Sequence, residues 1–376
     1  MILKKEKLSD LLAALASKAQ VYVPTLADEQ TRFALYEAGA SVDLGFTKTV
    51  FSPKELLFPQ TETLYSYSQL GEDVSIVPAT CDTNQVIFGI RSCDAYSIER
   101  MDEVFLTRSF VDTLYYEKRL GTLIVALGCA KAERSCFCTS FGIDPASAPG
   151  ADIQLLEAED GYFVEALSDK GTEALAEWEP YLAQGEKPAP AALDFAIVLD
   201  TQGIKESCEK MFDHPYWNDL SMKCLGCGTC AFVCPSCYCF DMSQSNKGKE
   251  GYRFRTWDSC TFVDYAMMAG FHNPRPTKKH RLRNRFMHKL SFYEERYGSC
   301  LCCGCGRCIE LCSAGIDISR VIEDVSQEMG SSPSTHATAQ LGQPGLPKEP
   351  LSQQAGTAID VADNHVNNRQ AEGGGS

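Results

Sequence analysis

The chain has 376 residues, of which 44% are hydrophobic, and this length is sufficient for two or three domains with packed cores. The formal net charge of −15 argues against nucleic acid as the main partner, because phosphate binding requires a basic surface. All nineteen cysteines lie between Cys81 and Cys312, in tight groups and in an odd number. This distribution indicates metal or redox chemistry rather than a disulfide framework.

Hydropathy and the N-terminal segment predict a cytoplasmic protein without a membrane span. No run of 18 apolar residues is present, so we expect no transmembrane helix. The short apolar stretch 11–16 follows Glu6 and Asp10, which favours an amphipathic helix over a signal peptide. Export of a folded cluster protein normally requires a twin-arginine signal, and the sequence has none.

Residues 1–200 are predicted to form an α/β domain. A helix at 8–19 leads into a strand at 20–24, and a loop region rich in proline and aromatic residues follows. Two β-branched apolar runs, 85–90 and 122–127, lie on either side of a helical pattern at 95–105. This order predicts a βαβ unit with parallel strands.

The rest of this domain is predicted from turn signals. Glu159-Asp160-Gly161 lies between two short apolar runs within 152–167, which predicts a hairpin. A helix at 171–184 closes the region, and 185–190 has the composition of a linker.

The most informative feature is a cysteine run that occurs twice, with the spacing C-x2-C-x2-C-x3-C. Bacterial-type ferredoxins bind two 4Fe-4S clusters with this pattern, and the fourth cysteine of each run binds the cluster of the other run. Two 4Fe-4S clusters are therefore expected. We assign the first to Cys224, Cys227, Cys230 and Cys312, and the second to Cys302, Cys305, Cys308 and Cys234.

Glycines within the runs support this interpretation, because Gly226, Gly228, Gly304 and Gly306 allow the backbone to wrap closely around a cluster. Zinc is the alternative, but a tetrahedral zinc site uses four ligands, usually as two C-x2-C pairs. Zinc would therefore leave half of each run without a function.

A long insertion, 235–301, separates the two runs and distinguishes the chain from a free ferredoxin. It carries Cys237, Cys239 and Cys260, to which the sequence assigns no role, and we interpret it as added surface. The stretch 275–289 holds seven Lys or Arg residues. They either balance cluster charge, face an acidic partner or form a solvated helix face.

A further cysteine set lies in the N-terminal domain, where two of its members follow predicted neighbouring strands. The carboxyl ends of such strands are where open α/β sheets build sites. The set predicts a possible third iron–sulfur cluster, with Asp94 as an alternative ligand. Two readings remain open: buried structural thiols, or a site that joins Cys136 and Cys138 to Cys237 and Cys239. The set comprises Cys93, Cys129, Cys136 and Cys138.

Four other cysteines, Cys81, Cys208, Cys300 and Cys303, are not expected to be ligands. No Walker loop or H-E-x-x-H motif is present, and we expect no flavin or nicotinamide in this chain. Residues 330–376 are rich in Ser, Gly, Pro, Gln and Ala and are predicted to be a disordered tail.

Several segments spread over 1–325 together resemble the β subunit of cytoplasmic nickel–iron hydrogenases (sulfhydrogenases) and the related iron–sulfur subunit of anaerobic sulfite reductase. The chain departs from that family at Ser92 and Ser313, where the family tends to have proline. The matching segments are Val86-Ile-Phe-Gly-Ile-Arg-Ser-Cys93-Asp94, Cys136-Phe-Cys-Thr-Ser-Phe-Gly142, Cys234-Pro-Ser-Cys-Tyr-Cys-Phe240, Thr256-Trp-Asp-Ser-Cys260, Asn273-Pro-Arg-Pro-Thr-Lys-Lys279 and Gly304-Cys-Gly-Arg-Cys308.

The resemblance implies an electron-transfer subunit in a hetero-oligomer. Its partners would be a flavin-containing, NAD(P)H-linked subunit and a catalytic subunit, such as a hydrogenase, a sulfite reductase or a heterodisulfide-reductase-like enzyme. We expect no active site in this chain. The alternative is a catalytic redox subunit that binds substrate or flavin at the N-terminal cysteine site.

The sequence thus predicts an α+β protein. An N-terminal α/β domain, 1–200, precedes a bacterial-ferredoxin-like two-cluster domain, 205–329, which contains the long insertion, and the disordered tail follows.

Overall fold

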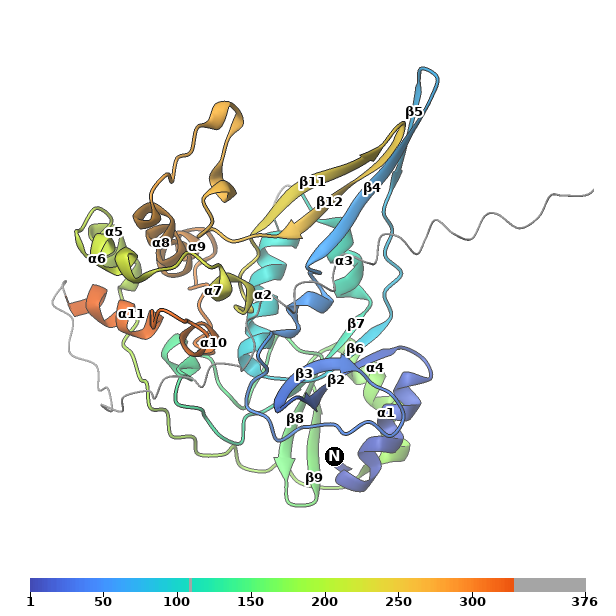
Figure 1. The fold of residues 1–376 in the computed structure, drawn as a ribbon. Helices are drawn as coiled ribbons and strands as arrows, with labels where there is room; N and C mark the ends of the chain where they lie inside the picture. Colours follow the sequence, from blue (N-terminus) through green and yellow to red (C-terminus); the bar gives the residue numbers. More distant parts are fainter. Residues whose placement is uncertain (108–109, 328–376) are drawn as a thin grey trace, which may run out of the picture. The chain divides into compact units, whose positions relative to one another are not determined.

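The computed structural model describes residues 1–107 and 110–327, so the predicted tail, 330–376, lies outside the described residues. An eight-stranded mixed sheet, in the order β10-β1-β9-β8-β7-β6-β2-β3, forms the N-terminal half (Figure 1). Its strands are β1 (Ile2–Lys4), β2 (Gln20–Ala27), β3 (Gln30–Leu35), β6 (Gln85–Ile90), β7 (Thr122–Leu127), β8 (Ile153–Ala158), β9 (Gly161–Ala166) and β10 (Leu182–Ala183).

The predicted βαβ unit is confirmed at the centre of this sheet. Strands β6 and β7 pair in parallel, and helix α2 (Ser92–Leu106) lies between them in the sequence. Side chains alternate along a strand, so Val86 and Phe88 point to one layer and Ile87 to the other. An irregularity between Phe88 and Ile90 shifts the alternation, and Ile90 therefore lies on the same side as Ile87. Both faces are therefore apolar, as expected of strands that helices cover on both sides.

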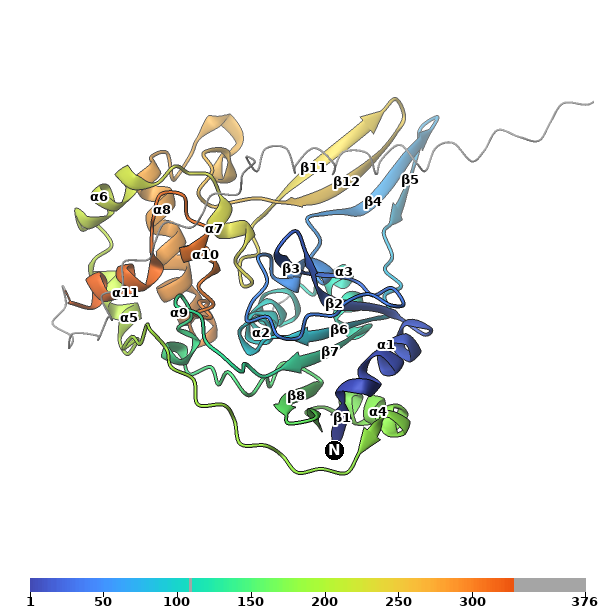
Figure 2. The same cartoon turned by 60° about the horizontal axis from the view of Figure 1, so that its bottom comes forward.

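Helices cover the two faces of the sheet separately (Figure 1, Figure 2). Helices α1 (Leu8–Ala16) and α4 (Asp169–Trp178) bury Leu12 and Trp178 on one face. Helices α2 and α3 (Thr113–Leu120) bury Met101 and Tyr115 on the other. The N-terminal part is therefore a three-layer α/β/α structure.

The hairpin predicted around Glu159-Asp160-Gly161 is confirmed as β8 and β9. The helix predicted at 171–184 ends earlier, at Trp178. Pro180 follows in a 3-10 turn, Glu179–Tyr181. A proline ring is incompatible with a continuing α-helix, and the last predicted residues instead form strand β10 at the sheet edge.

A second, four-stranded antiparallel sheet was not predicted. Its order is β11-β12-β4-β5, so a hairpin from the insertion pairs with a hairpin from the N-terminal half. The prediction of a loop region around Pro53 and Pro59, after the strand at 20–24, was therefore wrong for 61–78, because this pairing joins segments far apart in the sequence. It was also wrong for 30–35, which forms β3 and pairs with β2. The strands are β4 (Thr61–Leu70), β5 (Asp73–Pro78), β11 (Phe240–Lys247) and β12 (Glu250–Trp257).

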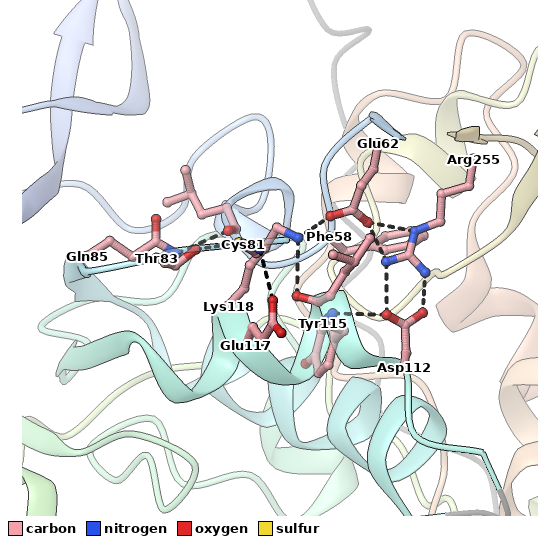
Figure 3. A network of polar contacts seen from close by, with 12 residues as sticks. Phe58, Glu62, Cys81, Thr83, Gln85, Asp112, Tyr115, Glu117, Lys118 and Arg255 are labelled. Atoms are coloured by element: carbon pink, nitrogen blue, oxygen red, sulfur yellow. Dashed lines mark hydrogen bonds and ion pairs between the residues drawn. The ribbon is translucent and has the colours of Figure 1, made fainter. Parts of the chain in front are cut away.

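A buried ion network holds the two hairpins to helix α3 (Figure 3). Arg255, on β12, donates to Glu62 on β4 with an Nε–Oε2 distance of 2.8 Å, and it also pairs with Asp112. Asp112 in turn accepts from the Tyr115 amide at the start of α3, and Lys118 pairs with Glu62. The Arg255 side chain is only 3% exposed, so its charge depends on these carboxylates.

Helices dominate the C-terminal half, and the chain before them, 184–203, is irregular where the linker is predicted. Their core is built on Trp217, Phe286, Leu290 and Val321. The helices are α5 (Ile204–Lys210), α6 (Tyr216–Lys223), α7 (Thr229–Phe232), α8 (Lys278–Met287), α9 (Tyr293–Tyr297), α10 (Arg307–Glu310) and α11 (Ile318–Gln327), and a π-helical turn, η7 (His288–Phe292), joins α8 to α9.

The predicted α+β class is confirmed. Helices and strands that lie within residues 1–327 form a sheet domain followed by a helical, cysteine-rich region. In the part of the chain that the structure describes, no helix is both long and apolar enough to span a bilayer.

Replacing Arg255 by methionine is expected to destabilise the protein. The change leaves the Glu62 and Asp112 carboxylates with an unbalanced charge, and removal of one partner of a buried ion pair costs about 3–5 kcal/mol. The midpoint of urea unfolding should fall accordingly. Lys247→Met, at an exposed end of the same hairpin, serves as the control. A shift for Arg255→Met no larger than that of the control would contradict the structural role of the network.

Candidate metal centres

The first cysteine run forms a tight loop that leads into α7. Gly226 and Gly228 have left-handed φ angles of 71° and 78°, which residues with a Cβ rarely adopt. The loop encloses a cavity of about 530 Å³, a volume that includes its opening to solvent. The cysteines of the predicted first set all line this cavity: Cys224, Cys227, Cys230 and Cys312.

The second run forms an equivalent loop before α10, with left-handed angles at Gly304 and Gly306. This loop packs directly on the backbone of the N-terminal half. A Cβ on Gly304 would lie 2.5 Å from the Phe137 backbone, and one on Gly306 would lie 2.3 Å from the Ser135 carbonyl oxygen. The smaller cavity here, of about 290 Å³, is lined by the predicted second set, Cys234, Cys302, Cys305 and Cys308, and also by Cys303.

A third cavity, of about 390 Å³, lies at the carboxyl edge of the central strands. Cys93 lies in the first turn of α2, directly after β6, and Cys129 follows β7 by one residue. The structure brings both together with the loop that carries Cys136 and Cys138, so all four line one cavity. Cys237 and Cys239 do not line this cavity. The geometry therefore gives no support to a site that joins Cys136 and Cys138 to Cys237 and Cys239.

The three cavities form a row, because two cysteines are shared between neighbours. Cys308 lines both the first and the second cavity. Cys305 lines both the second and the third. The second cavity therefore lies between the other two.

Asp94 has a different role from the one considered in the sequence. It was a candidate hard ligand beside Cys93, but its carboxylate forms a bidentate pair with Arg307, at 2.7 and 2.9 Å. Both side chains are 1% exposed. The pair connects α2 to α10, and so ties the third cavity to the second cysteine run. Arg307 also donates to the Thr49 carbonyl, at 2.7 Å.

Buried cations surround the second cavity. Lys289, in η7, donates to the Cys234 sulfur and to Ser236, both at 3.1 Å. Burial opposes the charged form of Lys289, but the Cys234 and Cys237 sulfurs outweigh it and hold its pKa well above the usual value. Arg285 lies 3.7 Å from the Cys237 sulfur. The basic residues of 275–289 therefore have different environments. Arg285 and Lys289 are buried beside sulfur, whereas Lys278 is exposed to solvent.

Lys54 is the functional residue that the sequence did not reveal. It is 3% exposed, and its Nζ donates to the carbonyl oxygens of Cys234 and Cys237, at 2.8 and 2.9 Å. These bonds orient the backbone that follows the first run. A single lysine in a Ser-Pro-Lys turn carries no local signal of such a contact, which only the tertiary structure creates.

The insertion cysteines form hydrogen bonds with one another and with the first run. The Cys260 thiol donates to Cys239 and lowers the pKa of Cys239 to about 6. The Cys237 thiol donates to Cys234, and with Lys289 it holds the pKa of Cys234 well below its usual range. Cys237 thus acts as a hydrogen-bond partner of a predicted ligand.

The cysteines that were not expected to be ligands have ordinary partners. Cys208 is buried in the helical core, Cys81 contacts the Thr83 hydroxyl, and Cys300 donates to Glu294 at 3.2 Å. Cys303 donates to Cys305 and so lowers the pKa of Cys305 to about 7.

The cavities fit a cubane cluster better than a single ion. A zinc ion requires its ligands to converge on one point, with Zn–S distances of about 2.3 Å. Among residues 1–107 and 110–327, no three His, Cys, Asp or Glu side chains are arranged to hold one metal ion. The cysteines of each predicted set instead line a common cavity.

Cluster loading would be coupled to proton release. Burial raises the pKa of Cys93 well above the usual thiol value and that of Cys138 to about 12, so both are neutral thiols without a metal. Metals bind the thiolate form, and each such ligand must lose its proton when the site fills.

Comparison with known proteins gives the class and the family of the chain. Residues 223–316 match the family model of the 4Fe-4S dicluster domain, which includes both cysteine runs and the insertion. The chain is therefore an iron–sulfur protein of the dicluster class. It is 31% identical to sulfhydrogenase 2 subunit beta of Pyrococcus furiosus over 340 residues, which cover 86% of this chain and 98% of that subunit. The chain belongs to the sulfhydrogenase β-subunit family, and the resemblance found in the sequence is confirmed.

The Asp94–Arg307 pair can be tested with a double-mutant design. Asp94→Leu or Arg307→Met alone leaves one buried charge without a partner and should lower stability by about 3–5 kcal/mol. The double variant replaces both charges by apolar groups and should recover much of the loss. The unfolding temperatures of the anaerobically purified single and double variants give their relative stabilities. A double variant less stable than both single variants would show that the pair acts through other contacts.

Proposed function

We propose that the chain is an electron-relay subunit with three 4Fe-4S clusters in a row. The observation that carries the proposal is the sharing of Cys305 and Cys308 between neighbouring cavities, which makes the three sites continuous. When bound, each cluster takes up and releases one electron at a time. The proposed ligands are the two sets assigned from the cysteine runs and, for the third cluster, Cys93, Cys129, Cys136 and Cys138. Each of the two ferredoxin-type clusters takes its fourth ligand from the other run.

The protein around the sites has two functions in this proposal. Left-handed glycines such as Gly226 and Gly304 bring the backbone close to the cluster, where N–H groups tune its potential. Arg285 and Lys289 place positive charge in the interior beside anionic sulfur, whereas burial lowers the pKa of Lys54, whose amino group donates to backbone carbonyls. Positive charge stabilises the reduced, more negative state of a cluster and raises its potential.

We further propose that the relay works within a cytoplasmic hetero-oligomer. One end would exchange electrons with a flavin-containing, NAD(P)H-linked subunit, and the other with a catalytic subunit, such as a hydrogenase. The support for a hetero-oligomer is that the relative is named as the β subunit of a sulfhydrogenase, and a β subunit is one part of a larger complex. For the domains, we propose the division 1–200 and 205–329, with the β11–β12 hairpin and the Asp94–Arg307 pair as the contacts that join them.

Iron and acid-labile sulfide content tests the number of clusters. We expect about twelve iron atoms per chain in anaerobically purified protein, since each 4Fe-4S cluster holds four. Cys129→Ala should reduce this number to about eight, and Cys208→Ala, a buried cysteine outside the cavities, should leave it unchanged. A wild-type value of about eight would remove the third cluster, and zinc without sulfide would overturn the proposed function.

The charge of Lys289 can be tested by its effect on a midpoint potential. Lys289→Met should lower one potential by on the order of 100 mV, the Coulomb energy of a unit charge at about 7 Å with an effective dielectric constant of about 20. The EPR signal of the reduced protein, followed during a redox titration, gives the value. Lys210→Met, an exposed lysine on α5, is the control. An unchanged or higher potential for Lys289→Met would contradict the electrostatic role.

A further inference from the structure

We propose that Cys239 and Cys260, in the insertion, form a redox-active dithiol that closes to a disulfide by exchange with a small organic disulfide. Neither cysteine lines any of the three cavities of the row, so the pair is a site apart from the proposed clusters. The reaction goes beyond the electron relay, because a dithiol releases two electrons together, whereas a 4Fe-4S cluster passes one at a time.

The open end of the β11–β12 hairpin brings the two cysteines together. Phe240, the first residue of β11, pairs with Trp257, the last residue of β12. One position further along, the Asp258 amide donates to the Cys239 carbonyl at 3.0 Å. Cys260 follows two residues later, and both its thiol and its amide donate to the Cys239 sulfur. Two sulfurs in hydrogen-bond contact need only a small movement to form a disulfide, whose S–S bond is about 2 Å long.

The segment that carries Cys260 is a turn held by hydrogen bonds on both sides of it. The Ser259 and Thr261 hydroxyls are 2.9 Å apart, and the Phe262 amide donates to the Ser259 carbonyl at 2.9 Å. Arg281, on α8, donates from its Nε to the Thr261 carbonyl at 3.1 Å. The backbone of the turn therefore fixes where the Cys260 sulfur lies.

The two sulfurs differ in charge and in access to solvent. The Cys260 thiol, with help from the Tyr265 hydroxyl and the charge of Arg285, lowers the pKa of Cys239 to about 6. The same hydrogen bond, together with burial, raises the pKa of Cys260 well above the usual thiol value. Cys239 is half-buried, whereas Cys260 is 6% exposed. The thiolate is the form that attacks a disulfide, so Cys239 is the attacking cysteine and Cys260 the resolving one.

The reaction consists of two exchanges. The Cys239 sulfur attacks one sulfur of the small disulfide, whose S–S bond breaks, and one small thiolate leaves. Cys239 is then joined to the other half in a mixed disulfide. The Cys260 thiol gives its proton to the departed thiolate, and its sulfur displaces the second half from Cys239. The protein loses two electrons, which the small disulfide gains as it becomes one thiol and one thiolate.

Cys237, the other cysteine of this region, is not the partner of Cys239. Its thiol donates to Cys234, a proposed cluster ligand. Arg285 lies 3.7 Å from its sulfur on α8. Oxidation of Cys237 would therefore disturb the second site, whereas oxidation of the Cys239–Cys260 pair leaves both contacts in place.

The pair is connected to the first cavity through the neighbouring residue. Thr261 follows Cys260 and lines this cavity, and its carbonyl oxygen would lie 3.7 Å from a Cβ on Gly226. Formation of the disulfide draws the Cys260 sulfur towards β11. The oxidation state of the dithiol therefore acts on a segment that forms part of the wall of the first cavity.

Disulfide mapping of the full-length, cluster-containing protein tests the proposal. Protein purified without oxygen is incubated with 2-hydroxyethyl disulfide, denatured in the presence of N-ethylmaleimide and digested. We expect one linked pair of peptides, which carry Cys239 and Cys260, and two fewer alkylated thiols than the nineteen of the untreated chain. The iron content should stay unchanged, because neither cysteine lines a cluster cavity.

Three results of the mapping would overturn the proposal. Full alkylation of Cys239 and Cys260 at every concentration of the small disulfide would show that the pair does not react. A linked pair that contains Cys237 would assign the reaction to another thiol. Loss of iron in step with disulfide formation would show that cluster ligands react instead.

Single variants test the roles of the two cysteines. Cys260→Ser lacks the resolving thiol, so Cys239 should stop at the mixed disulfide and keep one mercaptoethanol. Cys239→Ser should keep none, because the remaining thiol is buried and neutral. Cys81→Ser, which changes a half-buried cysteine beside the Thr83 hydroxyl, is the matched control and should form the disulfide as the wild type does. An adduct on Cys260 in Cys239→Ser, or none on Cys239 in Cys260→Ser, would contradict the assigned roles.

Discussion

The second cysteine run packs on the backbone of the segment 135–138, and the rest of the structure depends on this contact. The Phe137 amide donates to the Gly304 carbonyl at 2.8 Å, and neither Gly304 nor Gly306 has room for a side chain. Because the contact is between backbones, it fixes the position of the loop closely. Cys305 lines both the second and the third cavity in this arrangement, so the contact at the two glycines brings these two sites together.

Burial of sulfur imposes a second constraint, which concerns charge. Cysteines that become thiolates in the interior require nearby positive charge, since isolated buried charges are strongly destabilising. The structure supplies it from two segments: Arg285 and Lys289 belong to the insertion, and Arg307 belongs to the second run. Arg307 in turn requires Asp94. The same charges that permit burial would also set the redox properties of the site.

The insertion has more functions than the added surface that the sequence indicated. Its hairpin completes a sheet with β4 and β5, and its helix α8 and turn η7 deliver the buried cations. The π-helical turn at Lys289 agrees with the frequent occurrence of such turns at functional sites. Its loop 263–272 projects outward from α7 and α8 (Figure 1). The insertion thus connects the interior of the relay to its surface.

The sequence by itself determined the local features: the βαβ unit from β-branched runs, the β8–β9 hairpin from Glu-Asp-Gly, and the two cysteine runs from their spacing. Each of these signals acts over a few residues, so periodicity and turn chemistry suffice to find it. Only the tertiary structure decided that β4 pairs with β12, that Asp94 binds Arg307 rather than a metal, and that Lys54 contacts the backbone near Cys234. These contacts join residues about 180 to 210 positions apart. Long-range pairing depends on how whole faces pack, and no local pattern records it.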